Sequence, residues 1–193
     1  MQGAGPYDVF VDANVWFSRT LRDWIGMLYT TPDHPPFVVH WTEDVLAELL
    51  YHLRKTHPDW SGLRITTIRD RMAGAFEGGR VDQYVIDAAY GGTDVGDAHV
   101  HSAAVACSAD VLVTCNVKDF VWDENQSTYE VMHPDDFLIL AADSFPELVQ
   151  EVTQRMSAYW VARSGESNLP AALRKADCPR FADRVRHHLH RMM

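Results

Sequence analysis

The sequence predicts an α/β fold with a parallel sheet of about four strands, followed by a helical extension. Along residues 1–140, short apolar runs alternate with longer segments of helical spacing, the pattern of strands joined by crossover helices. The run at residues 111–114 is almost wholly apolar, as expected for a strand of a parallel sheet covered on both faces. Residues 141–193 contain only helical segments. We therefore expect a domain at 1–140 and a helical C-terminal extension at 141–193.

Short runs of β-branched and aromatic residues predict the strands. The predicted strands are residues 7–11, 37–40, 84–86, 111–114 and 130–132. Apolar residues at helical spacing predict the helices, and prolines or paired glycines end several of them. The predicted helices of the first domain are residues 14–29, 43–55, 63–76 and 97–108, and Thr42 is the predicted N-cap of the second of these. A further helix is expected to begin near Pro134. Two or three more are expected after Ser144, with breaks near residues 164–170 and 177–179.

The composition indicates a protein of the reduced cytoplasm. No apolar run approaches the roughly 20 residues that a membrane span requires. The N-terminus lacks the basic and then apolar pattern of a secretory signal. Cys107, Cys115 and Cys178 are odd in number and show no CxxC spacing, so we predict free, buried thiols.

Charge is distributed unevenly along the chain. Residues 1–140 carry 9 Lys and Arg against 21 Asp and Glu, a balance of −12. Residues 141–193 carry 8 against 6, a balance of +2. A basic tail on an acidic body suits a metal-dependent nuclease, because a metal offsets the carboxylates while remote arginines bind phosphates. A solvated helical face explains the same charges. The candidate phosphate-binding residues of the tail are Arg180, Arg184 and Arg186.

Acidic residues recur where predicted strands or helices end. In open α/β sheets, ligand sites form at the carboxyl edge of the strands. Carboxylates gathered there repel one another unless a cation neutralises them, and hard cations such as Mg²⁺ and Mn²⁺ take oxygen ligands. The sequence therefore predicts a carboxylate-based metal site. Its candidate residues are Asp12, Glu48, Asp94, Asp97 and Asp119.

Several of these residues also have a structural explanation. Asp12 suits a helix N-cap, and Asn14 could either orient the Asp12 carboxylate or serve as the cap itself. Glu48 lies at the border of an apolar helical stripe, where a side chain is either solvated or able to reach over the sheet edge. His99 and His101 are two residues apart on a helix and cannot face one ion together.

The segments around the remaining candidates are similarly ambiguous. Asp94 and Asp97 form a capping arrangement, although the helix dipole also suits a ligand at Asp97. Asn116 and Asp119 follow the strand at 111–114, where a carboxamide and a carboxylate indicate a ligand site or an ordinary turn.

The order of four motifs is more specific than any one of them. VDANVW, a helical Glu, DVGDAHVHSAA and DVLVTCNVKDF together resemble the PIN-domain nucleases, and within them the VapC-like toxin ribonucleases, over roughly residues 7–140. The resemblance implies a three-layer α/β/α fold with a small parallel sheet, an endoribonuclease activity that needs Mg²⁺ or Mn²⁺, and often a bound antitoxin or a dimer. By position, Asp12, Glu48 and Asp97 match the core acidic ligands and Asp119 matches the fourth.

The resemblance also assigns supporting roles. Asn116 stands where many members carry another Asp, which removes one negative charge and leaves open whether a second metal is held. Asp94 matches an acidic position of a subset. Asn14, Thr114 and Asn116 would orient the ligands, and Lys118 would contact the scissile phosphate unless it is simply solvated.

The expected reaction is hydrolysis of RNA phosphodiester bonds, in a loop of a structured RNA. Two other classes of function stay open from the residues alone. One is a metal-dependent nuclease or phosphohydrolase that acts on DNA or a small phosphate ester. The other is a catalytically silent module whose acidic cluster binds an Arg-rich partner.

Overall fold

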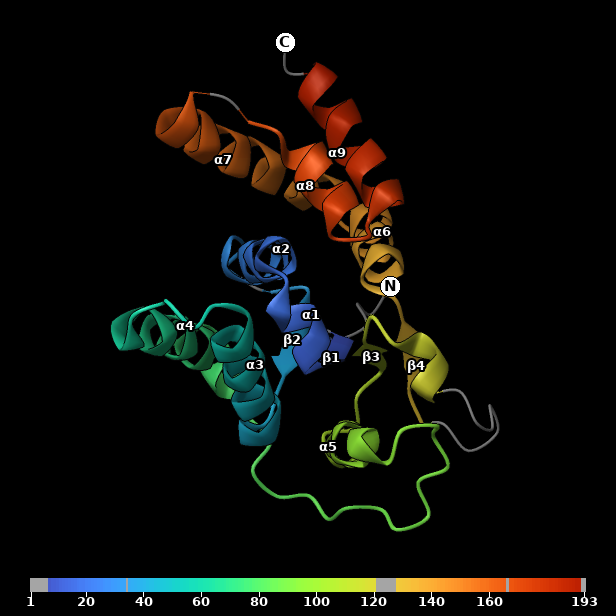
Figure 1. The fold of residues 1–193 in the computed structure, drawn as a ribbon. Helices are drawn as coiled ribbons and strands as arrows, with labels where there is room; N and C mark the ends of the chain where they lie inside the picture. The colour runs from blue at the N-terminus through green and yellow to red at the C-terminus, as the bar shows by residue number, and fades with distance from the viewer. Residues whose placement is uncertain (1–6, 34, 121–127, 166, 192–193) are drawn as a thin grey trace. The chain divides into compact units, whose positions relative to one another are not determined.

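The computed structural model describes residues 7–33, 35–120, 128–165 and 167–191, and it confirms an α/β protein with an all-parallel sheet (Figure 1). The strand order is β2-β1-β3-β4. In the middle of the sheet, Val9 of β1 pairs with Val39 of β2 on one side and with Val111 of β3 on the other. The four strands are β1 (Tyr7–Val11), β2 (Phe37–His40), β3 (Val111–Val113) and β4 (Glu130–Met132).

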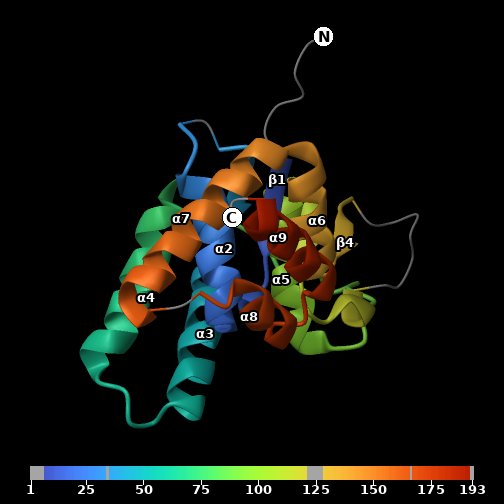
Figure 2. The same cartoon turned by 90° about the horizontal axis from the view of Figure 1, so that it is seen from above.

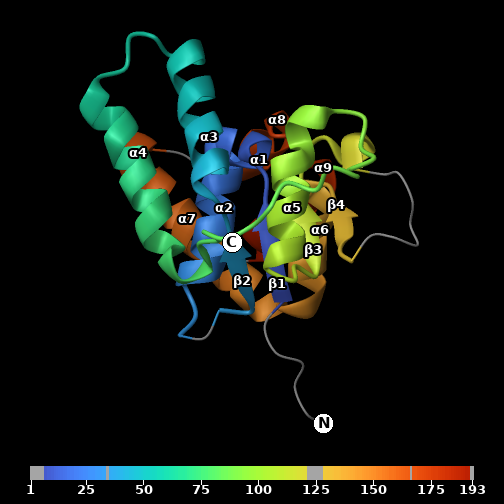
Figure 3. The same cartoon turned by 90° about the horizontal axis from the view of Figure 1, so that it is seen from below.

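The chain forms two compact units, and the first contains the sheet. It comprises residues 1–17 and 36–133. Its helices α3 and α4 lie beside β2, while α5 lies over β1 and β3 (Figure 3). Thr42 caps α3 as predicted, because its hydroxyl accepts a hydrogen bond from the amide of Val45 at 3.1 Å. The α-helices of this unit are α1 (Ala13–Phe17), α3 (Glu43–Thr56), α4 (Gly62–Ala75) and α5 (Ala98–Ala106).

The second unit is helical and comprises residues 18–35 and 134–193. Its helix α2 packs along α7 and α8 (Figure 2). The ring of Trp24 meets that of Phe181 edge-on, with centroids 4.8 Å apart, and both residues are fully buried. Asp135 accepts hydrogen bonds from the first amides of α9, including that of Phe181 at 2.9 Å. The helices are α2 (Arg19–Thr30), α6 (Pro134–Ser144), α7 (Pro146–Ser164), α8 (Leu169–Lys175) and α9 (Pro179–Arg191).

The predicted helix at residues 14–29 is in fact two helices. Ser18 interrupts it, and the Ser18 hydroxyl accepts the amide of Leu21 at 3.4 Å as the N-cap of α2. The break also divides the units, since α1 belongs to the sheet unit and α2 to the helical unit. The compact units are discontinuous in sequence, and the domains at 1–140 and 141–193 stay a prediction.

Two further predictions were wrong. Residues 84–86 form no strand, and Val85 and Ile86 are 88% and 51% exposed, so neither is part of the core. The three cysteines are free as predicted, but only Cys178 is buried, whereas Cys107 is partly exposed and Cys115 exposed. None of the helices in the described part of the chain has the length and apolar character that crossing a bilayer requires.

Candidate functional site at the carboxyl edge of the sheet

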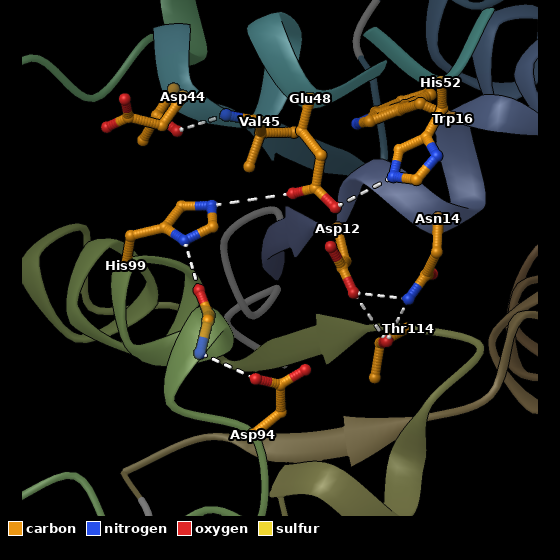
Figure 4. Close-up of polar contacts among 12 residues, drawn as sticks. Asp12, Asn14, Trp16, Asp44, Val45, Glu48, His52, Asp94, His99 and Thr114 are labelled. Carbon is orange, nitrogen blue, oxygen red and sulfur yellow. Dashed lines mark hydrogen bonds and ion pairs between the residues drawn. The ribbon is translucent and has the colours of Figure 1, made fainter. Parts of the chain in front are cut away.

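Asp12 and Thr114 form the floor of the site. β1 and β3 are parallel neighbours with Val11 opposite Val113, so the residues that follow each strand lie side by side. The Asp12 amide donates to the Val113 carbonyl at 3.1 Å. The Thr114 hydroxyl donates to Oδ2 of Asp12 at 2.8 Å (Figure 4). Both side chains are buried, at 4% and 0% exposure. The carboxylate of Asp12 is therefore fixed in position.

Asn14 holds the same group from α1. Its Nδ2 donates to Oδ2 of Asp12 at 2.6 Å and to Thr114 Oγ1 at 3.0 Å. Its Oδ1 accepts the amide of Cys115 at 2.9 Å. Asn14 lies inside the helix rather than at its cap. Of its two predicted roles, the geometry favours orientation of Asp12.

The charge of Asp12 is opposed by its surroundings. Burial raises its pKa above the ordinary value, and the nearby carboxylate of Glu48 raises it further. The hydrogen bond from Thr114 acts in the opposite direction because it stabilises the ionised form. The network that positions Asp12 thus also offsets part of the cost of its charge.

Glu48 enters the site from α3 between two histidines. Its Oε1 lies 3.5 Å from Nε2 of His52, and its Oε2 lies 3.9 Å from Nε2 of His99 (Figure 4). Nδ1 of His99 bonds the carbonyl of Gly96 at 2.8 Å. Among the described residues, Nε2 of His99 is a buried atom with no hydrogen-bond partner. The imidazole therefore presents a polar atom toward Glu48 and the site.

Asp94 and Asp97 lie on a short 3-10 helix, Val95–Asp97, that leads into α5. Asp94 caps it as predicted, because Oδ1 accepts the amide of Gly96 at 2.8 Å. Asp97 makes no capping bond through its side chain. Burial raises the pKa of Asp97 to about 7, and the carboxylates of the other four acidic residues add to the shift. In order of effect these are Asp12, Asp94, Asp119 and Glu48.

Asp119 is tied to the loop that precedes Asp94. Its Oδ1 accepts the Thr93 hydroxyl at 2.6 Å, and its carbonyl accepts the Thr93 amide at 3.2 Å. The carbonyl also accepts the hydroxyl of Tyr90 at 3.2 Å. Burial raises the pKa of Tyr90, as do the nearby carboxylates, of which Asp97 has the largest effect. This loop therefore closes the acidic site on the side of Asp119.

Asn116 and Lys118 lie at the margin of the site. The Asn116 amide donates to Thr114 Oγ1 at 3.0 Å, and its carbonyl accepts the Asp119 amide at 2.9 Å, so its backbone forms the turn. The side chains of Asn116 and Lys118 are exposed. The Lys118 side chain lies in solvent on the 3-10 helix Val117–Phe120.

The structure thus brings four of the predicted carboxylates within electrostatic reach of the fifth, Asp97, since each of them contributes to its raised pKa. The carboxylates do not form a preformed metal-binding site. Within the described residues, no three His, Cys, Asp or Glu side chains are arranged so that they could ligate one ion as they stand. The donor set itself, carboxylate oxygens with a carboxamide nearby, has the chemistry of a Mg²⁺ or Mn²⁺ site.

The tail arginines belong to the helical unit and have acidic partners there. The Arg180 guanidinium pairs with Asp136. Arg184 Nη2 lies 2.7 Å from Oδ1 of Asp143. Arg186 pairs with Asp183 one turn before it on α9. These contacts favour a structural role over the predicted grip on phosphates.

Four residues of the site were not predicted. His52 follows Glu48 by one helical turn, so the spacing along α3 could have indicated it. His99 and His101 do face different partners, as their spacing predicts, since His99 lies 3.9 Å from Glu48 and His101 contacts the Tyr129 hydroxyl at 2.6 Å. Thr93 and Tyr90 reach Asp119 from a loop without periodic pattern, so the sequence held no signal for them.

No protein-family model, curated protein or solved structure matches this chain. What the site can do follows from its own residues. Its hydrogen-bond network immobilises Asp12, and burial, with the neighbouring carboxylates adding to the shift, raises the pKa of Asp97 to about 7. A cation would relieve this repulsion, and a group that titrates near neutrality can exchange a proton with a bound molecule.

Proposed function

We propose that the chain is a Mg²⁺- or Mn²⁺-dependent endoribonuclease with a three-layer α/β/α, PIN-like fold, and that it is the toxin of a toxin–antitoxin pair. The single observation that carries the proposal is the gathering of Asp12, Glu48, Asp94 and Asp119 around Asp97, whose pKa is raised to about 7 by burial first and by these four carboxylates in addition. The order of motifs that resembles the VapC-like ribonucleases supports the choice of RNA and of an antitoxin partner.

Asp12, Glu48, Asp97 and Asp119 would hold the ion. When bound, a divalent cation supplies a water of lowered pKa and stabilises the charge that develops on a phosphate. Binding would need side-chain rotation in the described site, since no three ligands are yet close enough for one ion. It would also need the loss of the Asp97 proton, which at neutral pH is about half present.

Other side chains of the site would position the ligands and exchange a proton. Asn14 and Thr114 keep Asp12 in one orientation, so little conformational freedom has to be lost when a ligand binds. Thr93 fixes Asp119 in the same way. Asp97 can hold or release a proton at its carboxylate oxygens near pH 7, which suits general acid–base exchange with a water at the phosphate.

The test is cleavage of RNA by the purified protein with Mg²⁺ or Mn²⁺, with and without EDTA. Asp12→Asn and Asp97→Asn should each lose most activity and keep a melting temperature at or above that of the wild type, because each removes a repelling charge. The matched control is Glu77→Gln, an exposed carboxylate outside the site. Equal cleavage in EDTA contradicts the metal mechanism.

Two alternatives have distinct outcomes in the same assay. A DNA nuclease or small-molecule phosphohydrolase would cleave single-stranded DNA or a phosphate ester with the metal and leave RNA intact. A silent binding module would cleave none of these substrates, yet would bind an Arg-rich peptide that depends on Asp12 and Asp97.

A further inference from the structure

The sheet unit concentrates its positive charge on the hairpin of α3 and α4. The unit carries 7 Lys and Arg against 17 Asp and Glu, yet residues 51–71 carry 5 against 2. Arg69 pairs with Asp70 at 2.6 Å. Within the described residues, the other four basic side chains of the hairpin form no ion pair with a carboxylate. These four are Arg54, Lys55, Arg64 and Arg71.

One face of α3 connects this basic hairpin to the acidic site. Glu48, Tyr51, His52 and Lys55 are spaced by three and four residues, so they lie on the same side of the helix. His52 contacts Glu48 at 3.5 Å, and its ring meets that of Tyr51 at a centroid distance of 5.5 Å. Nζ of Lys55 lies 5.9 Å from the Tyr51 ring. The face continues for about 10 Å from the site.

This face of α3 is exposed although it carries aromatic groups. The core side of the helix buries other residues, among them Leu49 and Leu53. The Tyr51 side chain, by contrast, is 62% exposed, and that of His52 is 48% exposed. An exposed aromatic ring with a cation beside it suits single-stranded nucleic acid, since a base stacks on the ring and a phosphate contacts the cation.

The tip of the hairpin holds two of the cations in place. Nη1 of Arg54 donates to the carbonyl of Trp60 at 2.6 Å. Cζ of Arg64 lies 3.6 Å from the Trp60 ring centre, and the ring of His57 stacks on Trp60 at 3.9 Å. The Trp60 ring is thus covered by its neighbours, whereas Tyr51 and the His52 side chain are 62% and 48% exposed and can meet a base.

We infer that the α3 face of Tyr51, His52 and Lys55, continued by Arg54 and Arg64 at the hairpin tip, binds the single-stranded RNA that leads into the carboxylate site. This inference rests on the proposed function, because it names the surface that delivers the substrate. It also assigns phosphate contact to the hairpin rather than to the tail, whose arginines have acidic partners.

The experiment measures the affinity of the full chain for a fluorescent single-stranded RNA by anisotropy in EDTA, where metal-dependent cleavage is off. Tyr51→Ala should weaken binding roughly tenfold, and Tyr51→Phe should retain it because the ring is kept. Lys55→Gln should lower the slope of log affinity against log salt by roughly 0.7. The matched control is Arg69→Gln on the same hairpin, because the Arg69 side chain already pairs with Asp70.

The outcomes separate this inference from the proposed function. If Tyr51→Ala and Lys55→Gln bind RNA as the wild type does, or if the wild type binds duplex RNA as well as single strands, the inference is overturned whatever the cleavage assay shows. If the wild type binds with the expected dependence on Tyr51 and Lys55 yet cleaves no RNA with Mg²⁺ or Mn²⁺, the binding surface stands and the catalytic proposal fails.

Discussion

The hydroxyl of Thr114 donates a hydrogen bond of 2.8 Å to Oδ2 of Asp12, although 102 residues separate them in the chain. The contact exists because β1 and β3 are parallel neighbours, so both side chains leave the sheet at the same edge. It stabilises the charged form of a carboxylate whose pKa burial raises. Thr114 therefore contributes both to the position of Asp12 and to its ionisation.

Thr114→Val should lower metal affinity and cleavage at neutral pH by roughly tenfold, because a hydrogen bond to a charged group contributes about 1.5–3 kcal/mol. The pKa of Asp12 should rise, so the acidic limb of the pH–rate profile should move to higher pH. Thr114→Ser keeps the hydroxyl and should restore both. A pH profile identical to that of the wild type would show that the hydroxyl does not support the charge.

Asp97 should make the protein less stable as pH rises. Its pKa is about 7 in the folded protein and near 3.8 when unfolded, so the folded state holds the extra proton between these values. The slope of unfolding free energy with pH is then negative, and the stability present below pH 4 is lost as pH passes 7. Asp97→Asn should remove this loss.

The expected gain of Asp97→Asn at pH 8 is roughly 1 kcal/mol after allowance for solvent screening, or about 2–4 °C in melting temperature. At pH 4 the variant and the wild type should melt together. The measurement is thermal unfolding in EDTA across this range. A difference in melting temperature that does not change with pH would mean that Asp97 is not protonated in the folded protein.

Metal binding should release a proton near pH 7. Because Asp97 is about half protonated there and a ligand must be ionised, the ion and the proton compete. Calorimetry with Mn²⁺ in two buffers of different ionisation enthalpy should give about half a proton released at pH 7, and Asp97→Asn should abolish the release. Heats that do not depend on the buffer would separate Asp97 from the metal.

Local sequence patterns predicted most helices and strands, and they also indicated some residues of the candidate site. Thr42 caps α3 and residues 7–11 form a strand because neighbouring residues decide these features. Asp12 could be found since it directly follows an apolar strand. The contact of His99 with Glu48 joins residues 51 positions apart, from α5 and α3, and no periodicity of either helix encodes it.

The errors have a similar origin. Residues 84–86 have the composition of a strand, but a strand needs a partner, and the exposed Val85 shows that this run is not part of the core. Ser18 is an ordinary residue in a helical pattern, and only its capping bond to Leu21 reveals that one predicted helix is two. Pairing and capping depend on atoms that the pattern of hydrophobic residues does not specify.

Asn116→Asp should raise metal affinity if the site lacks one ligand. The Asn116 side chain is exposed, and its backbone forms the turn that brings Asp119 back, so the substitution should leave the fold intact. Calorimetry with Mn²⁺ should then show several-fold tighter binding, since one more carboxylate oxygen faces a hard cation. Equal or weaker binding would limit Asn116 to its part in the turn.

The last prediction concerns the tail. Replacing Arg180, Arg184 and Arg186 with Gln should lower the free energy of unfolding by roughly 1 kcal/mol, because exposed ion pairs contribute about 0.2–1 kcal/mol each. The pairs lost are those with Asp136, Asp143 and Asp183. Affinity for single-stranded RNA and its salt dependence should not change.

High salt provides the check on mechanism. At 1 M salt the Debye length is about 3 Å, so the difference in melting temperature between this triple variant and the wild type should shrink. Arg191→Gln, an exposed arginine at the end of the same helix α9, is the control and should melt as the wild type does. A triple variant that melts normally but loses RNA affinity, with a reduced salt slope, would return the phosphate-binding role to the tail and remove it from the α3–α4 hairpin.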